Sequence, residues 1–206
     1  KEKFRGHISY IKVDKNTGGL SLDFQLALPP FNYDLSHSGK NASADWSFFT
    51  CYNTEEAHSL LEVNASHNDK DYILAINWKK AAEHAAKGDF DWKPCKYAHN
   101  VMHEDTEQAT SEILNKVKVI DTRKYNDFLY LIPCPKSPHG VDVDPSGEYI
   151  VGNGKLSANL PVFSFTKIQD AIKNHQCDGK VDGINVIKYE SALHGEVQSP
   201  GLGSLH

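Results

Sequence analysis

The sequence has little of several features that mark large functional classes. It contains a single methionine, Met102, and no basic run longer than Lys79-Lys80, with 22 Lys and Arg against 27 Asp and Glu. Nucleic-acid-binding domains usually carry clustered positive charge, so this pattern argues against a nucleic-acid partner. No apolar run approaches the roughly 18 residues that a membrane-spanning helix needs, so we expect no membrane span.

Several local motifs of catalytic and metal sites are also missing. The four cysteines, Cys51, Cys95, Cys134 and Cys177, form no Cys-x-x-Cys pair, which excludes a zinc ribbon, a thioredoxin motif and c-type haem attachment. There is no Ser-His-Asp arrangement, Gly-rich phosphate loop or zincin helix. The cysteines either form disulfides in an exported protein or remain small buried apolar residues, and the sequence leaves both interpretations open.

What the chain does contain is a series of short strand-like segments, which predict a mainly β fold. Between Leu20 and Leu28, apolar residues alternate with polar or small ones, the period of a strand with one buried face. Asp144-Pro145-Ser146-Gly147 predicts a tight hairpin turn between two such segments. Further strands are expected at His7–Val13, Trp46–Tyr52, Tyr72–Asn77, Val117–Ile120, Phe128–Ile132, Val141–Val143, Glu148–Val151, Pro161–Phe165 and Ile184–Lys188.

Two helices are expected, over Trp78–Lys87 and Lys167–His175. In the second, Ile168, Ala171, Ile172 and His175 have the spacing of one helical stripe. Each helix directly follows an apolar strand, and this pattern repeats after about 89 residues, which suits two units of roughly 45 residues, the size of a four-stranded propeller blade. The sequence therefore predicts an all-β chain of contiguous propeller blades, with two short helices in the connections.

Histidine is the most suggestive residue type, with eleven copies. Pro138 stiffens the chain before His139, and Gly140 clears space beside the imidazole. A Gly-rich segment leads to His206 in the same way. Imidazole nitrogens suit copper, zinc, iron or nickel, whereas the alternative is that both histidines only begin strands. His84, on the Ala-rich helix, is expected at the surface.

Oxygen ligands gather in a different region. Cys51–Glu56 and Asn68–Asp71 bring carboxylates and carbonyls together around a loop. Such groups suit a hard cation such as calcium, and a solvated acidic loop is the alternative.

Taken together, these segments resemble nitrous-oxide reductases, and most closely the atypical branch of that family. The resemblance covers essentially the whole chain and is carried by Phe49–Ala57, Asp71–Asn77, Ser137–Gly140, Asp144–Val151, Gly154–Ser157, Val162–Phe165 and Gly201–His206. It implies a seven-bladed β-propeller that holds a four-copper, sulfide-bridged cluster, followed by a C-terminal cupredoxin domain with a dinuclear copper centre. Residues 1–206 would be part of the N-terminal propeller domain, about four blades of it, and the cupredoxin domain would be absent from this chain.

The resemblance also assigns individual ligands. His139 and His206 match two copper ligands of the family, although Ser204 replaces the usual Pro before His206. Tyr52, Glu55 and Asp71 match ligands of a calcium site near the copper cluster. A further calcium ligand of the family is an Asn, and Ser137 stands in its place.

The activity implied by the resemblance is the reduction of nitrous oxide to dinitrogen and water in denitrification, catalysed by a copper-dependent oxidoreductase of the periplasm. The implied partners are nitrous oxide, a second subunit in a homodimer, and a small periplasmic electron donor such as a cytochrome c or a cupredoxin. Residues 1–206 alone are expected to be inactive. Two other interpretations remain: a non-catalytic propeller that serves as an interaction scaffold, and a calcium-dependent propeller hydrolase.

Overall fold

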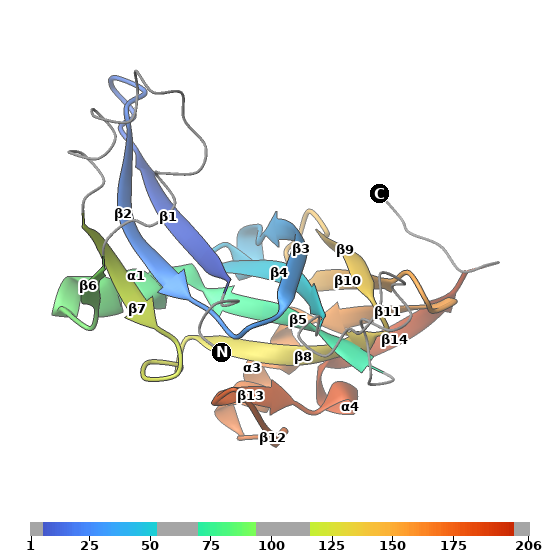
Figure 1. Cartoon of the computed structure of the whole chain (residues 1–206). Helices are drawn as coiled ribbons and strands as arrows, with labels where there is room; N and C mark the ends of the chain where they lie inside the picture. Colours follow the sequence, from blue (N-terminus) through green and yellow to red (C-terminus); the bar gives the residue numbers. More distant parts are fainter. Residues whose placement is uncertain (1–5, 53–69, 94–115, 200–206) are drawn as a thin grey trace.

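The structure, a computed structural model, describes residues 6–52, 70–93 and 116–199. Within these ranges it contains fourteen strands in three sheets, so the predicted mainly β fold is confirmed (Figure 1). The helices of this part of the chain are α1 (Trp78–Lys87), α3 (Phe165–Lys173), the single turn α4 (Tyr189–Ala192) and the 3-10 helix η2 (Asn41–Ser43). No helix within the described ranges is long and apolar enough to cross a membrane.

The largest sheet has the strand order β12-β13-β8-β5-β4-β3. Four of its strands are antiparallel neighbours, as in a propeller blade: β3 (Asn32–Ser38), β4 (Trp46–Tyr52), β5 (Lys70–Asn77) and β8 (Leu129–Pro135). The strand β13 (Ile184–Ile187) joins β8 in parallel, and β12 (Cys177–Val181) pairs antiparallel with β13.

A second sheet is a complete four-stranded antiparallel unit in the order β14-β11-β10-β9. Its strands are β9 (Pro138–Val143), β10 (Tyr149–Gly154), β11 (Asn159–Ser164) and β14 (Leu193–Gln198). The hairpin turn predicted at Asp144–Gly147 is confirmed, since Gly147 N donates to Asp144 O at 3.0 Å and Gly147 has a φ of 77°. These two neighbouring sheets fit a partial β-propeller.

The third sheet has the order β1-β2-β7-β6 and a parallel β2–β7 pair. Its strands are β1 (His7–Val13), β2 (Leu20–Ala27), β7 (Val117–Asp121) and β6 (Asp91–Lys93). Hairpin β1–β2 projects from the body of the molecule (Figure 1). The predicted alternation along β2 therefore buries only its inner half: Phe24 and Leu26 are buried, whereas Leu20 is 71% exposed.

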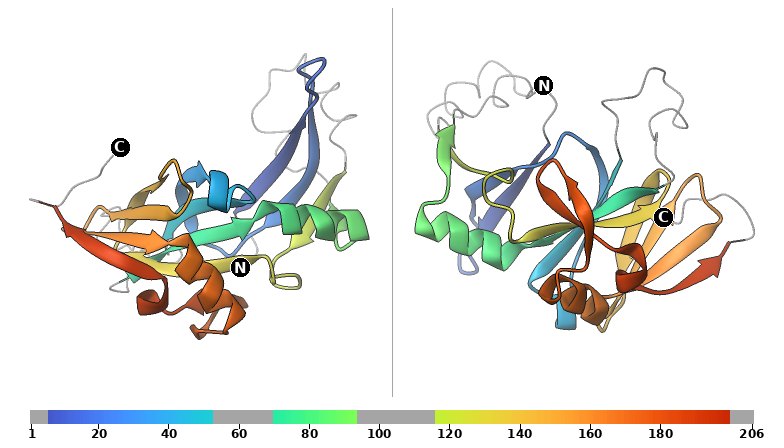
Figure 2. Two further views of the ribbon diagram at one scale, coloured as in Figure 1. Left: turned by 180° about the vertical axis from the view of Figure 1, so that it is seen from behind. Right: turned by 90° about the horizontal axis from the view of Figure 1, so that it is seen from below.

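Apolar clusters cover both faces of the β3–β4–β5–β8 strands. Figure 2 shows the ribbons of these strands and their neighbours from two further sides. On one face, Phe48 and Ile132 pack with Val141, Ile150 and Phe163 of the second sheet. The cluster on the other face joins β2 and α1 and includes Phe24, Leu74, Leu131, Ala81 and Phe128. Burial of apolar surface between stacked sheets supplies the main stabilisation of such an arrangement, as it does between propeller blades.

The two predicted helices are present. Helix α1 has the predicted limits because Asn77 Oδ1 accepts from Lys80 N at 2.9 Å and Gly88, with a φ of 89°, ends the helix. Helix α3 begins two residues earlier than predicted because the Ser164 hydroxyl caps it, accepting from Lys167 N at 3.1 Å. His175 lies beyond its end with a φ of 54°, so the predicted place of His175 in the helical stripe is wrong.

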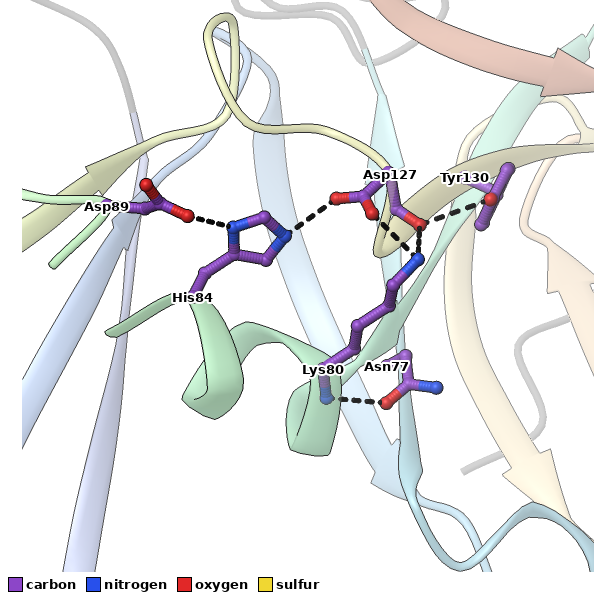
Figure 3. Close-up of polar contacts among 6 residues, drawn as sticks. All are labelled: Asn77, Lys80, His84, Asp89, Asp127 and Tyr130. Carbon is purple, nitrogen blue, oxygen red and sulfur yellow. Dashed lines mark hydrogen bonds and ion pairs between the residues drawn. The ribbon is translucent and has the colours of Figure 1, made fainter. Parts of the chain in front are cut away.

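His84 is not the surface residue that the sequence suggested, because its side chain is only 14% exposed. Its ring lies between two carboxylates, with Nδ1 2.8 Å from Asp89 Oδ2 and Nε2 2.8 Å from Asp127 Oδ1 (Figure 3). Lys80 Nζ contacts the other Asp127 oxygen at 2.7 Å. Partial burial raises the pKa of Asp127, but hydrogen bonds from Lys80 and His84 outweigh that effect and hold it below its ordinary value.

Three of the four cysteines lie in the described residues, and all three are free thiols. Cys51 and Cys134 are fully buried, as expected for small apolar residues. Burial, together with the nearby Asp71 carboxylate, raises the pKa of the Cys51 thiol well above its usual value. Cys95 lies outside the described residues.

Candidate functional site

The candidate copper ligand His139 lies where the edges of two sheets meet. Strand β9 is an edge of its sheet, β3 is an edge of the largest sheet, and the two strands contact each other (Figure 1). On β9, Gly140 pairs with Asn153 and Pro138 pairs with Gly154, so His139 is the extra residue of a β-bulge. Bulges redirect side chains and are common beside functional sites.

A second bulge faces the first. On β3, Asp34 and Leu35 together oppose the single residue Thr50 of β4. The two bulges bring the side chains of Asp34 and His139 together, so that Asp34 Oδ2 lies 2.6 Å from His139 Nδ1. The side chains of His139 and Asp34 are 21% and 25% exposed.

This hydrogen bond assigns the tautomer of His139. An ionised carboxylate only accepts, so the proton of the neutral ring lies on Nδ1 and the lone pair lies on Nε2. Metal-ligating histidines almost always donate their other ring N–H to a carboxylate or carbonyl in this way. The observed pair therefore fits the role of a metal ligand with its orienting partner.

Lys155, just after β10, connects this pair to a candidate calcium ligand. Its Nζ lies 3.6 Å from Asp34 Oδ2 and 5.7 Å from the centre of the Tyr52 ring. The Tyr52 hydroxyl accepts a hydrogen bond from Asn32 Nδ2. A cation over an aromatic face is attracted by the ring quadrupole, so Lys155 contacts both parts of the site.

The candidate calcium ligands Tyr52 and Asp71 lie on neighbouring strands, where the β4–β5 register pairs Cys51 with Tyr72. Asp71 is 1% exposed, and its Oδ2 accepts from Ser137 N at 2.7 Å. Ser137 is also buried and has a φ of 58°, in the left-handed region. Burial, with the charge of Asp71, raises the pKa of Tyr72.

Close backbone contact explains the glycine of the Gly-Lys-Leu-Ser segment. A Cβ atom on Gly154 would lie 2.6 Å from Pro135 O and 2.7 Å from Lys136 O. The backbone of Lys155 in turn donates to Ser137 O at 2.8 Å. Gly154 and Lys155 therefore contact residues 135–137, the segment that precedes the bulge at His139.

Two of the candidate ligands, His206 and Glu55, lie outside the described residues. Within residues 6–52, 70–93 and 116–199, no three His, Cys, Asp or Glu side chains form a group that could hold a metal ion. Among the candidate ligands in the described residues, Tyr52 and Asp71 lie on adjacent strands. His139 contacts Asp34, which was not a candidate. No sequence pattern pointed to Asp34, and Thr50 and Lys155 lie in segments of the family resemblance without an assigned role, because contacts between distant strands leave no local pattern.

Comparison with known proteins gives a consistent set of relatives, although no family model matches the chain. The chain is 28% identical to the nitrous-oxide reductase of Pseudomonas fluorescens over 179 residues, which is 85% of this chain and 22% of that protein. It is 27% identical to the nitrous-oxide reductase of Stutzerimonas stutzeri, again over 85% of this chain and 22% of that protein. A third, from Ralstonia nicotianae, is 35% identical over 75 residues, 36% of this chain and 10% of that protein.

The chain is similar to nitrous-oxide reductases at low identity. The similarity extends over most of the chain, in agreement with the resemblance of its motifs. The chain spans about a fifth of the length of these relatives, 22% in the two longer matches.

Proposed function

We propose that residues 1–206 are part of the N-terminal copper-cluster propeller domain of a nitrous-oxide reductase, an oxidoreductase that converts nitrous oxide to dinitrogen and water in denitrification. The observation that carries the proposal is the His139–Asp34 pair, which gives the Pro-His-Gly histidine the tautomer and the partner of a metal ligand. The similarity to nitrous-oxide reductases over 85% of the chain supports the same function.

In this proposal, His139 Nε2 and the ring of His206 are two ligands of a four-copper sulfide cluster. A bound cluster of this kind would supply electrons for the reduction of an otherwise inert substrate. The residues of this chain position it: Asp34 holds the proton on His139 Nδ1, and the β9 bulge directs the ring. Neither histidine acts as a general base.

Tyr52, Glu55 and Asp71 are the proposed calcium ligands. Asp71 is buried, and a buried carboxylate is costly unless it is paired with hydrogen-bond donors or a cation. The Ser137 N–H provides one donor. Ser137 differs from the Asn of the family, so its contribution to the proposed site is this backbone N–H.

The remaining proposals concern the whole protein. They are a periplasmic location, a homodimer, a cupredoxin domain with a dinuclear copper centre, and electron delivery by a small periplasmic cytochrome c or cupredoxin. Because the cupredoxin centre would pass electrons to the cluster, we expect residues 1–206 alone to be inactive.

The test uses the complete protein that carries this chain, produced in a host that assembles copper nitrous-oxide reductases. Copper content and the consumption of nitrous oxide, measured by gas chromatography, should both be lost in His139→Ala. His194→Ala is the matched control, because His194 lies on β14 and contacts the Tyr149 ring, outside the site. A wild-type protein without copper or activity would favour the scaffold, and calcium-dependent ester or lactone hydrolysis would favour the hydrolase.

A further inference from the structure

One buried hydroxyl group joins the two bulges that carry Asp34 and His139. Thr50 is fully buried on β4, opposite the β3 bulge. Its Oγ1 accepts a hydrogen bond from Leu35 N at 3.0 Å. It lies 2.9 Å from His139 O and 3.3 Å from Leu35 O. A hydroxyl has one proton, and the nearer acceptor is the His139 carbonyl.

These contacts address a problem that bulges create. Each bulge interrupts the regular ladder and leaves backbone polar groups without their usual partners. Buried, unpaired groups cost free energy, so the local backbone adopts the arrangement that satisfies them. Thr50 bonds one group from each bulge, Leu35 N–H on β3 and His139 C=O on β9. It therefore sets the position of one bulge relative to the other.

We propose that Thr50 is a positioning residue for the candidate copper ligand. Its hydroxyl aligns the backbones of Leu35 and His139 so that the adjacent Asp34 carboxylate meets His139 Nδ1. Thr50 acts through these residues and does not itself bind metal. This inference rests on the proposed function for its effect on copper, whereas its effect on the His139–Asp34 distance is independent of copper.

The chain offers a matched control in Thr122. Like Thr50, Thr122 is fully buried, and its hydroxyl donates to a distant carbonyl, Ala27 O on β2, at 2.7 Å. Its contact joins the end of β2 to the segment after β7, away from Asp34 and His139. Valine has nearly the same shape as threonine, so replacing either threonine by valine removes one buried hydroxyl and changes little else.

The experiment compares Thr50→Val, Thr50→Ser and Thr122→Val in the complete protein. Thr50→Val should lengthen the His139 Nδ1–Asp34 Oδ2 distance in a crystal structure, weaken copper binding by about tenfold, and change the copper absorption and paramagnetic resonance spectra. Thr50→Ser keeps the hydroxyl and should show the wild-type distance, copper affinity and spectra. Thr122→Val should lower the melting temperature by a similar amount but leave the distance and the copper signals at wild-type values.

Several results would overturn the inference. The first is a Thr50→Val protein with an unchanged His139–Asp34 distance, and the second is unchanged copper affinity and spectra. Equal loss of copper in Thr122→Val would attribute the effect to general stability. A wild-type protein that binds no copper would instead refute the proposed function, and the distance in Thr50→Val would still decide whether Thr50 positions His139.

Discussion

Nδ1 of His139 lies 2.6 Å from Oδ2 of Asp34, although the two residues are 105 positions apart in the chain. If the ring ligates copper through Nε2, Asp34→Asn should weaken copper binding by about 10- to 100-fold, as for other partners of metal-ligating histidines. Competition against a copper chelator measures this. Asp142→Asn is the control, since Asp142 lies on the same strand with a side chain 72% exposed. Equal affinities in both variants would refute the orienting role of Asp34.

Local features of the fold could be predicted from the sequence. Asp144-Pro145-Ser146-Gly147 predicted its hairpin, and the limits of α1 followed from the Ala-rich segment that directly follows an apolar strand. Each depends on residues within one or two turns of the chain, where propensity and capping act.

The assembly of the strands could not be predicted in the same way. Periodicity indicates which face of a strand is buried, but does not identify its neighbour. The parallel pairs β2–β7 and β8–β13 join distant segments and depart from the antiparallel blade that the sequence suggested. Likewise, no residue pattern around Asp34 predicts a bulge, so the contact between Asp34 and His139 could not be predicted from the local sequence. The ligand roles of His139, His206, Tyr52, Glu55 and Asp71 all stay predictions.

Ser137 has a left-handed backbone while fully buried beside the Pro-His-Gly segment. A non-glycine residue held there costs about 1–3 kcal/mol. Ser137→Gly should therefore leave the free energy of unfolding unchanged or raise it, and Ser137→Asn should be tolerated because Asn adopts this conformation readily. Ser137→Val, with its β-branched side chain, should lower the free energy of unfolding by more than about 2 kcal/mol. Urea denaturation measures the series, and a tolerated valine would contradict the argument.

Gly147 combines a positive φ of 77° with close backbone contact, since an added Cβ would lie 1.7 Å from Lys40 O. Gly88 has a φ of 89° but nothing within 4 Å of an added Cβ. Gly88→Ala should therefore cost only the left-handed conformation, about 1–2 kcal/mol. Gly147→Ala should cost about 1–3 kcal/mol more, because η2 must move away from the hairpin. If urea denaturation shows the same loss of stability in Gly88→Ala and Gly147→Ala, the contact between η2 and the hairpin adjusts without cost.

The same hairpin contains an acid-sensitive group. The Tyr149 N–H, and then the Ser146 hydroxyl, donate to the Asp144 carboxylate and lower its pKa to about 2. Because the folded-state pKa lies below the unfolded value of about 3.9, the stabilisation is present above pH 4 or so and is lost as the pH falls through about 2. Asp144→Asn should therefore flatten the fall of melting temperature between about pH 4 and pH 2. Asp178→Asn, at an exposed position outside the hairpin, is the control.

The His84 side chain connects α1 to both Asp89 and Asp127, each at 2.8 Å (Figure 3). His84→Ala removes both hydrogen bonds and should lower the free energy of unfolding by about 1–3 kcal/mol, since hydrogen bonds to charged groups are the stronger kind. Lys79→Ala on the same helix is the control: its ion pair with Asp45 spans 3.0 Å, but the side chains are 61% and 46% exposed. Such an exposed pair contributes less than about 1 kcal/mol. Urea denaturation of both variants measures the difference, and a loss in His84→Ala no larger than in Lys79→Ala would mean that water replaces the carboxylate contacts without cost.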